Sequence, residues 1–222
     1  MTTLNTLNEP RVAAALRRMF AEAERDDMAS ARAAAAQLGI DFNTVGAQEK
    51  ADLVAEVYMP ISAEAGRLLY SLVRAVRPRT VVEFGMSFGI STLHLAAAVR
   101  DNGVGRVVTT ELSAHKIVTA RKTFAETGLD ELITVLEGDA LQTLPGELGE
   151  GVDLVLLDGW KDLYLPVLHL LEPHLASGTL VFADDTEFES VKPYLAYVRD
   201  PKNGYESVLF PVEDGLEISC RL

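Results

Sequence analysis

The stretch VVEFGMSFGIST, residues 81–92, is the most informative part of this chain about its fold. Its apolar start predicts a short buried strand, and its end predicts the first turn of a helix. Gly85 and Gly89 lie between the two, where glycine lets the backbone turn tightly and approach a ligand closely. Ser91 stands at the helix start, where backbone N–H donors are free. The stretch therefore predicts a strand–turn–helix unit with a ligand at the turn.

The glycine spacing, G-x-x-x-G, differs from the G-x-G-x-x-G of dinucleotide-binding loops. Glu83 precedes the first glycine by two residues, and its carboxylate would repel a pyrophosphate but accept an ammonium group. The loop therefore favours a ligand with a cationic group. The alternative is that Gly85 and Gly89 only form the turn and that Ser91 only caps the helix.

From this unit onward, short apolar strands alternate with segments of helical length. Strands that are apolar on both faces and alternate with helices predict a parallel sheet covered on both sides. The predicted strands are 81–84, 104–111, 133–138, 152–158 and 178–185, and the helices predicted to follow them are 90–100, 113–127, 140–148, 162–176 and 188–199.

The two ends of the chain differ from this α/β region. An Ala-rich segment, 9–38, predicts a helix that ends at Gly39, and further helices are expected at about 47–58 and at 63–77. At the other end, 206–212 and 216–222 flank a glycine-containing loop and predict an antiparallel hairpin, with Pro211 at an edge strand or bulge.

The predicted elements add up to a doubly wound, mostly parallel α/β sheet of seven strands with additional N-terminal helices. We expect a single domain, 1–222, that consists of an N-terminal helical extension, 1–60, and an α/β core, 61–222. The core should bind its ligand outside the carboxyl ends of the strands.

The composition excludes some classes of partner. The chain has 222 residues and a net charge of −13, whereas nucleic-acid binders gather positive charge on one face, so we expect neither nucleic acid nor an anionic membrane as a partner. No apolar run approaches the roughly 20 residues that span a bilayer. With Cys220 as the one cysteine and no secretory leader evident, the sequence indicates a cytoplasmic protein.

Polar residues follow the next two predicted strands. Glu111 ends the second strand, where a carboxylate can accept hydrogen bonds from a ribose diol. Asp139 and Ala140 follow the third, where a carboxylate beside a close backbone suits the amino group of an adenine. The alternatives are a solvated glutamate and a helix N-cap by Asp139.

This order of motifs resembles the class I S-adenosylmethionine-dependent methyltransferases. The resemblance narrows to the catechol and caffeoyl-coenzyme A O-methyltransferase group through DGWKDLYLP (158–166) and GTLVFADD (178–185), followed by YLAYVRD (194–200) and VEDGLE (212–217). It covers the chain from about residue 47 onward. The resemblance implies a Rossmann-like methyltransferase fold and transfer of a methyl group from S-adenosylmethionine to a hydroxyl of a small, catechol-like acceptor.

The same resemblance implies roles for individual residues. Lys161 acts on the acceptor hydroxyl, and Mg²⁺ or another divalent cation is held by Asp158, Asp184 and Asp185. Trp160 and Tyr164 lie at the acceptor pocket. The residues implied to contact S-adenosylmethionine are Met59, Ser62, Glu83, Gly85, Ser91, Glu111, Asp139, Ala140 and Asp158.

The sequence departs from the family at three positions. Asp185 stands where the family usually has asparagine, and Gly159 replaces the histidine of the catechol enzymes. The glutamate that binds the second catechol hydroxyl in those enzymes has no match, since Val208 falls near its place. Three carboxylates can still hold a hard cation through oxygen.

Other interpretations of the sequence remain open. Asp184 and Asp185 could cap the next helix, which would give a metal-independent methyltransferase. The chain could also bind S-adenosylmethionine without catalysis, and a dinucleotide oxidoreductase is disfavoured by the glycine spacing. The Ala-rich helix at 9–38 is a candidate interface for a homodimer.

Overall fold

Seven strands form one sheet in the order β3-β2-β1-β4-β5-β7-β6. Strands β1 to β5 pair in parallel, whereas β7 is antiparallel to both β5 and β6. This arrangement confirms the predicted fold class, including the C-terminal hairpin. The strands are β1 Thr80–Phe84, β2 Arg106–Glu111, β3 Ile133–Glu137, β4 Val152–Leu157, β5 Leu175–Ala183, β6 Tyr205–Phe210 and β7 Leu216–Arg221.

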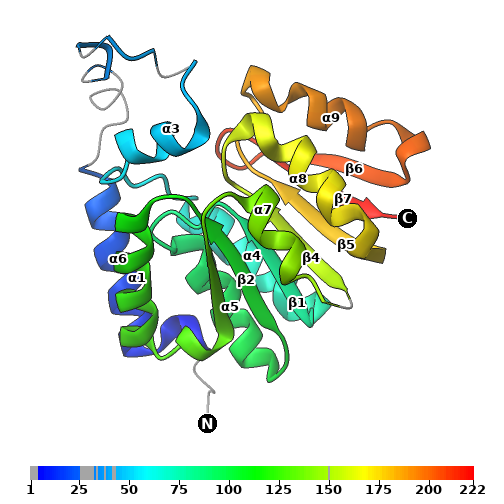
Figure 1. The fold of residues 1–222 in the computed structure, drawn as a ribbon. Coiled ribbons are helices and arrows are strands. Elements are labelled where there is room, and N and C mark those ends of the chain that lie inside the picture. The colour runs from blue at the N-terminus through cyan, green and yellow to red at the C-terminus, as the bar shows by residue number, and fades with distance from the viewer. Residues whose placement is uncertain (1–4, 26–32, 34, 38, 42–43, 150) are drawn as a thin grey trace.

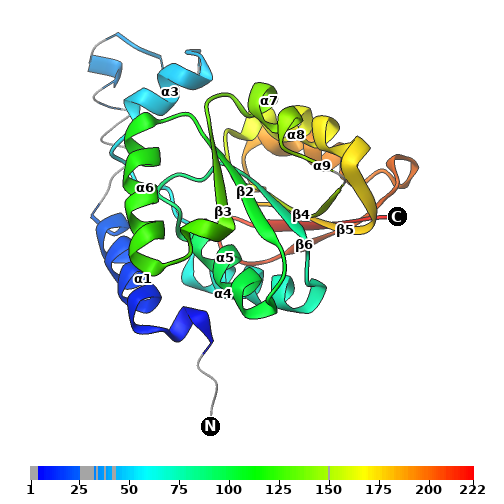
Figure 2. The same ribbon diagram turned by 60° about the horizontal axis from the view of Figure 1, so that its bottom comes forward.

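The computed structural model describes residues 5–25, 33, 35–37, 39–41, 44–149 and 151–222. Helices cover both faces of the sheet, with α1, α4, α5 and α6 on one face and α7, α8 and α9 on the other (Figures 1 and 2). The α-helices are α1 Pro10–Ala23, α3 Ala47–Leu53, α4 Ala63–Val76, α5 Ile90–Asn102, α6 Ala114–Thr127, α7 Ala140–Thr143, α8 Tyr164–Leu171 and α9 Lys192–Val198. The 3₁₀ helices are η1 Thr6–Asn8, η2 Asp130–Leu132, η3 Leu144–Gly146, η4 Lys161–Leu163, η5 Glu172–His174, η6 Glu189–Val191 and η7 Pro201–Asn203.

The side chains of β1 alternate between two apolar cores. Val81 packs into the core that α1, α4, α5 and α6 cover, and Val82 and Phe84 pack into the core under α7, α8 and α9. This two-residue period, which is a property of any strand, places Glu83 on the same face as Val81. The strand is fully buried, as the sequence predicts for the centre of a parallel sheet.

The predicted helix 9–38 is wrong as one continuous element. Helix α1 ends at Ala23 and a turn follows, whereas residues 26–32, 34 and 38 of the prediction lie outside the described residues. The predicted helix end at Gly39 is confirmed, because Gly39 has φ +75° and its N–H donates to the carbonyl of Ala36 at 3.0 Å. Such a left-handed glycine is a common end of a helix.

Four other helices are shorter than predicted. The helix expected at 47–58 ends at Leu53, because the next residue, Val54, leaves the helical conformation and buries its side chain. Pro145 and Pro173 lie in the 3₁₀ turns that cut short the helices predicted at 140–148 and 162–176. The helix predicted at 188–199 begins as a 3₁₀ turn, and its α-helical part is Lys192–Val198.

The strand order reverses at β1, whose neighbours are β2 on one side and β4 on the other. The loops after these strands diverge there, which is where open α/β sheets bind ligands. Among the described residues, we find no helix with the length and apolar character needed to cross a bilayer.

Candidate active site

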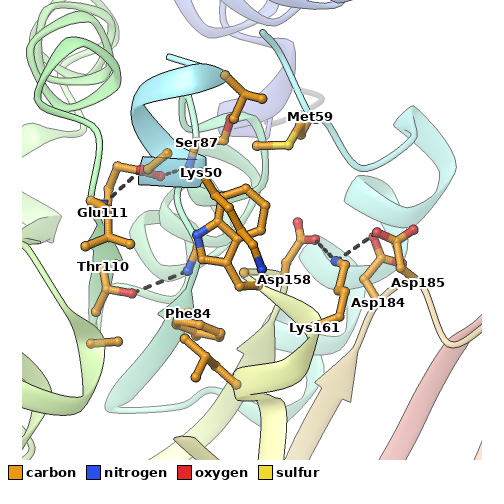
Figure 3. A pocket seen from close by; sticks show the side chains of 18 of the residues that line it. Lys50, Met59, Phe84, Ser87, Thr110, Glu111, Asp158, Lys161, Asp184 and Asp185 are labelled. Atoms are coloured by element: carbon orange, nitrogen blue, oxygen red, sulfur yellow. Dashed lines mark hydrogen bonds and ion pairs between the residues drawn. The ribbon is translucent and has the colours of Figure 1, made fainter. Parts of the chain in front are cut away.

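A cavity of about 540 Å³ lies at the carboxyl edge of the sheet, at this reversal of strand order. Figure 3 shows Thr110 and Glu111 on one side of it and Asp158, Lys161, Asp184 and Asp185 on the other. We call these the glutamate side and the aspartate side. The predicted site residues that line the cavity are Met59, Gly85, Glu111, Asp139, Ala140, Asp158, Trp160, Lys161, Asp184 and Asp185.

Gly85 brings the two sides together. Its φ of +98° lies in the region that favours glycine, and a Cβ added there would approach the carbonyl oxygen of Asp158 and the backbone of Gly159 to 2.6 Å. The loop after β1 is also tied to the end of β4, since the N–H of Asp158 donates to the carbonyl of Phe84 at 2.8 Å. A side chain at position 85 would force these two loops apart.

Backbone hydrogen bonds fix the carboxylate of Glu111 on the glutamate side. One oxygen accepts from the N–H of Ser87 at 2.8 Å, and the other accepts from the N–H groups of Leu112 and Ser113 at 2.9 and 2.8 Å. Asp139 accepts from the N–H of Leu141 at 2.9 Å and so caps α7, while it also lines the cavity. For Asp139, the capping role and a position at the cavity both hold.

Four predicted site residues do not line the cavity. Glu83 has 0% exposure and accepts hydrogen bonds from the hydroxyls of Thr92 and Thr109 at 2.5 and 2.6 Å, so it lies beneath the glycine loop. Ser91 is also buried, and Ser62 caps α4 by accepting from Ala65. The fourth, Tyr164, is buried in the core behind Lys161. Direct cofactor contact by Ser62, Glu83 and Ser91 stays a prediction that the cavity does not support.

Three carboxylates meet on the aspartate side. Asp158 follows β4, and Asp184 and Asp185 follow β5. Each offers one oxygen in a group whose members all lie within 4.8 Å of one another. One oxygen of Asp184 is buried and has no hydrogen-bond partner among the described residues. The neighbouring parallel strands β4 and β5 end side by side, which explains why residues from two separate loops converge.

Lys161 lies against these carboxylates. Its Nζ is 2.8 Å from Asp185 Oδ2 and 3.3 Å from Asp158 Oδ1, and it donates to the hydroxyl of Tyr164 at 2.8 Å. Tyr164 has 0% exposure, and its hydroxyl donates in turn to the carbonyl of Asp184 at 3.2 Å. Tyr164 therefore holds the ammonium from the core side, whereas the predicted acceptor contact of Tyr164 finds no support in this position.

The cluster shifts the pKa values of its members. Burial raises the pKa of Asp158 well above its ordinary value, and the charges of Asp184 and Asp185 raise it further. Burial and then the charge of Asp185 raise the pKa of Asp184 to about 6. Burial disfavours the ammonium of Lys161, but Tyr164, Asp158 and Asp185 together raise its pKa well above the ordinary lysine value. The cluster is thus short of positive charge.

Asp185 adopts a left-handed backbone conformation with φ +56°. Asparagine and aspartate are among the non-glycine residues that tolerate this region, which explains how either one can follow Asp184. The extra carboxylate at this position is the partner of Lys161 at 2.8 Å.

Several other residues at the cavity carry no signal in the sequence that would select them. Lys50 reaches it from α3, Phe188 from the loop after β5, and Glu213 and Asp214 from the hairpin loop between β6 and β7. Val208, by contrast, is 61% exposed on β6 and does not line the cavity. The sequence predicts the hairpin loop, but no local pattern indicates that its acids face a cavity built by other strands.

Similarity to known proteins covers the strands that build this cavity. A family described as a methyltransferase domain matches residues 82–186, which run from β1 past the end of β5. Catechol O-methyltransferase B of Danio rerio is 34% identical over 177 residues, which cover 74% of this chain and 66% of that protein. Catechol O-methyltransferase of Mus musculus is 29% identical over 171 residues, which cover 72% of this chain and 64% of that protein. The chain thus spans just under two thirds of the length of these relatives.

The fold is shared with solved structures. An O-methyltransferase from Bacillus cereus in complex with SAH has a TM-score of 0.65 and 21% sequence identity, over 79% of this chain and 89% of that one. At this identity the likeness concerns the fold. The strand order and the glycine loop agree with this likeness, residues 82–186 match the methyltransferase domain family, and the chain is similar in sequence to catechol O-methyltransferases.

Proposed function

We propose that this protein transfers a methyl group from S-adenosylmethionine to a hydroxyl of a small, catechol-like aromatic molecule, with assistance from a divalent cation. The observation that carries the proposal is the composition of one cavity. Its aspartate side gathers three carboxylates and a lysine, and its glutamate side presents a fixed carboxylate beside a glycine loop.

In this proposal, the glutamate side holds the methyl donor. Glu111 receives the ribose hydroxyls, and Asp139 and Ala140 lie at the adenine. Gly85 lets the loop after β1 pack directly against the backbone of Asp158 and Gly159, which brings the donor side next to the aspartate side. The methyl group is bound to the positively charged sulfonium sulfur of the donor. As the acceptor oxygen bonds to the methyl carbon, the carbon–sulfur bond breaks and the rest of the donor leaves as a neutral sulfide.

A divalent cation fits the aspartate side. Oxygen is the ligand type that Mg²⁺ prefers, and Asp158, Asp184 and Asp185 supply three oxygens from two strand ends. The unpartnered buried oxygen of Asp184 and the raised pKa values of Asp158 and Asp184 indicate carboxylates that would be stabilised by positive charge. When bound, such an ion would act as a Lewis acid toward the acceptor oxygen.

Lys161 would handle the proton of the acceptor hydroxyl. A phenol has a pKa of about 10 in water, so at neutral pH it keeps its proton unless the site favours the anion. The ammonium of Lys161 can donate a hydrogen bond to that oxygen, and a neutral Lys161 can accept its proton. The surrounding carboxylates favour the ammonium, so deprotonation of Lys161 requires added positive charge in the cluster.

The test is methylation of a catechol, followed by mass spectrometry, with and without EDTA. We expect product that requires S-adenosylmethionine and Mg²⁺ and that disappears on chelation. Activity that is unchanged by EDTA would favour the metal-independent alternative, for which the ion pair between Lys161 and Asp185 is the supporting observation. Binding of S-adenosylmethionine without any turnover on a panel of catechols and phenols would favour a noncatalytic binding protein.

We also propose a cytoplasmic location and a homodimer, the second through the N-terminal helices. Helix α1 presents exposed residues on the face opposite to its buried Val12, Leu16 and Met19, so it has a surface available for a second copy. Light scattering coupled to size-exclusion chromatography measures the mass and tests the dimer.

A further inference from the structure

We propose that Lys50 binds an acidic substituent of the acceptor, so that the preferred acceptor is a hydroxylated aromatic acid. The inference rests on the proposed function and adds the substrate class. Lys50 belongs to α3, outside the matched residues 82–186, and lines the cavity. Figure 3 shows its side chain extending into the cavity between the glutamate side and Asp158.

The cationic side chains at the cavity differ in their partners. Lys161 forms ion pairs with Asp158 and Asp185, and Lys116 donates to the hydroxyl of Ser87 at 3.2 Å. Lys50 forms no ion pair with any described carboxylate; its ammonium lies 5.7 Å from the centre of the Trp160 ring. An aromatic face stabilises an ammonium only modestly, so the ammonium of Lys50 can still bind an anionic group.

Charge balance explains why a separate cation is useful here. Asp185 adds a negative charge where the family usually has a neutral asparagine. Lys161 and one divalent cation therefore only neutralise the three carboxylates of the aspartate side, and no positive charge is left over for an anionic acceptor. Exposed Glu213 and Asp214 make the rim more negative. An acceptor that carries a carboxylate would be repelled from this side unless a cation faced that group, and Lys50 supplies it.

The position of Lys50 also suits an aromatic acceptor. Trp160 lies two residues after Asp158 and lines the same cavity, so one ring system connects the neighbourhood of the carboxylates with that of Lys50. An aromatic ring against Trp160 can therefore direct a hydroxyl toward Lys161 and a carboxylate toward Lys50. Such packing is the usual way in which aromatic faces orient a ligand ring.

The test compares two acceptors of nearly the same size and shape, the anionic 3,4-dihydroxybenzoate and the neutral 3,4-dihydroxybenzamide. Both are titrated by calorimetry into protein saturated with S-adenosylhomocysteine and Mg²⁺, and their methylation rates are measured separately. We expect the wild type to favour the benzoate, and Lys50→Met to weaken benzoate binding about tenfold while the benzamide is unaffected. Lys50→Arg should restore the preference, and Lys122→Met, which removes an exposed lysine on α6, should leave it unchanged.

Equal binding of the two acceptors by the wild type, with methylation of both, would overturn this inference and leave the proposed function intact. Weakened S-adenosylhomocysteine binding in Lys50→Met would also overturn it, because the cation would then serve the methyl donor. Absence of methylation of either acceptor by the wild type would overturn the proposed function and the inference together.

Discussion

At the scale of single residues, Lys161 is held at three points. Asp158, Asp185 and the hydroxyl of Tyr164 surround its ammonium, and Tyr164 is anchored to the backbone of Asp184. Replacement of Lys161 would leave Asp158 and Asp185 without their cationic partner, so the melting temperature of a variant is measured together with its turnover.

We expect Lys161→Met to lower turnover by about 10²- to 10⁴-fold, the range for loss of a group that positions or transfers a proton. Binding of S-adenosylhomocysteine, measured by calorimetry, should change little, because the glutamate side is untouched. Lys192→Met is the matched control, since Lys192 is exposed and pairs with Glu189 on the surface. A Lys161→Met protein with normal turnover would remove this residue from the mechanism.

Asp184 makes the stability of the metal-free protein depend on pH. Its pKa in the folded state is about 6, raised by burial and by Asp185, whereas the ordinary pKa of an aspartate is 3.8. The folded state therefore binds this proton more tightly than the unfolded state, and the contribution of Asp184 to stability falls as pH rises from about 4 to above 6. The difference corresponds to at most about 3 kcal/mol.

Accordingly, Asp184→Asn should raise the melting temperature in EDTA at pH 8 and change it little at pH 4. The same substitution should abolish the stabilisation that Mg²⁺ gives the wild type, because it removes one of the three carboxylates. Differential scanning calorimetry at the two pH values, with and without Mg²⁺, measures both effects. A lower melting temperature of the variant in EDTA at pH 8 would contradict the expected direction of the pH dependence.

At the scale of elements, the loop after β1 and the loop after β4 are packed in direct contact. Gly85 occupies the contact, and Gly103, at the end of α5, gives a matched comparison. Both have positive φ, but a Cβ at Gly103 would meet nothing within 4 Å. The difference between the two alanine variants therefore isolates the contact from the backbone strain.

We expect Gly103→Ala to destabilise the protein by about 1 kcal/mol, the cost of the left-handed conformation alone. Gly85→Ala should cost about 2–4 kcal/mol, since overpacking adds to the strain. It should also weaken S-adenosylhomocysteine binding, because the two loops border the cavity. Urea unfolding of both variants gives the free energies, and equal values would mean that the loops separate without cost.

At the scale of the whole molecule, α1 shares one apolar core with α4, α5, α6 and the sheet. We therefore propose that the N-terminal extension and the α/β core behave as a single domain and unfold in one transition. S-adenosylhomocysteine at 100 times its dissociation constant should stabilise the chain by about 2.7 kcal/mol. For a protein of this size, that corresponds to a rise in melting temperature of roughly 5–11 °C.

The control for this measurement is NADH at the same concentration, which should leave the melting temperature unchanged because the glycine loop lacks the dinucleotide spacing. Two separate transitions, with one insensitive to S-adenosylhomocysteine, would show that the extension folds independently. A shift with NADH alone would contradict the assignment of the donor.

Local sequence patterns are sufficient to establish the fold class and the edge of the sheet that carries the site. Strand and helix periodicity are local properties, and parallel strands necessarily gather their carboxyl ends at one edge. Asp158, Asp184 and Asp185 could therefore be predicted to converge from their places after two strands. The turn after β1 could also be predicted, because glycine is the residue that favours positive φ angles and two glycines follow this strand.

Which of these side chains face the cavity depends instead on tertiary packing. Glu83 and Glu111 both belong to strands, but the two-residue period of β1 turns Glu83 under α5, whereas Glu111 ends β2 and reaches the cavity. Lys50 and Glu213 belong to segments far along the chain from the strands of the site, and the local sequence around them does not predict that they line the cavity. Contacts of this kind depend on the packing of whole elements, and packing is a property of the folded chain alone.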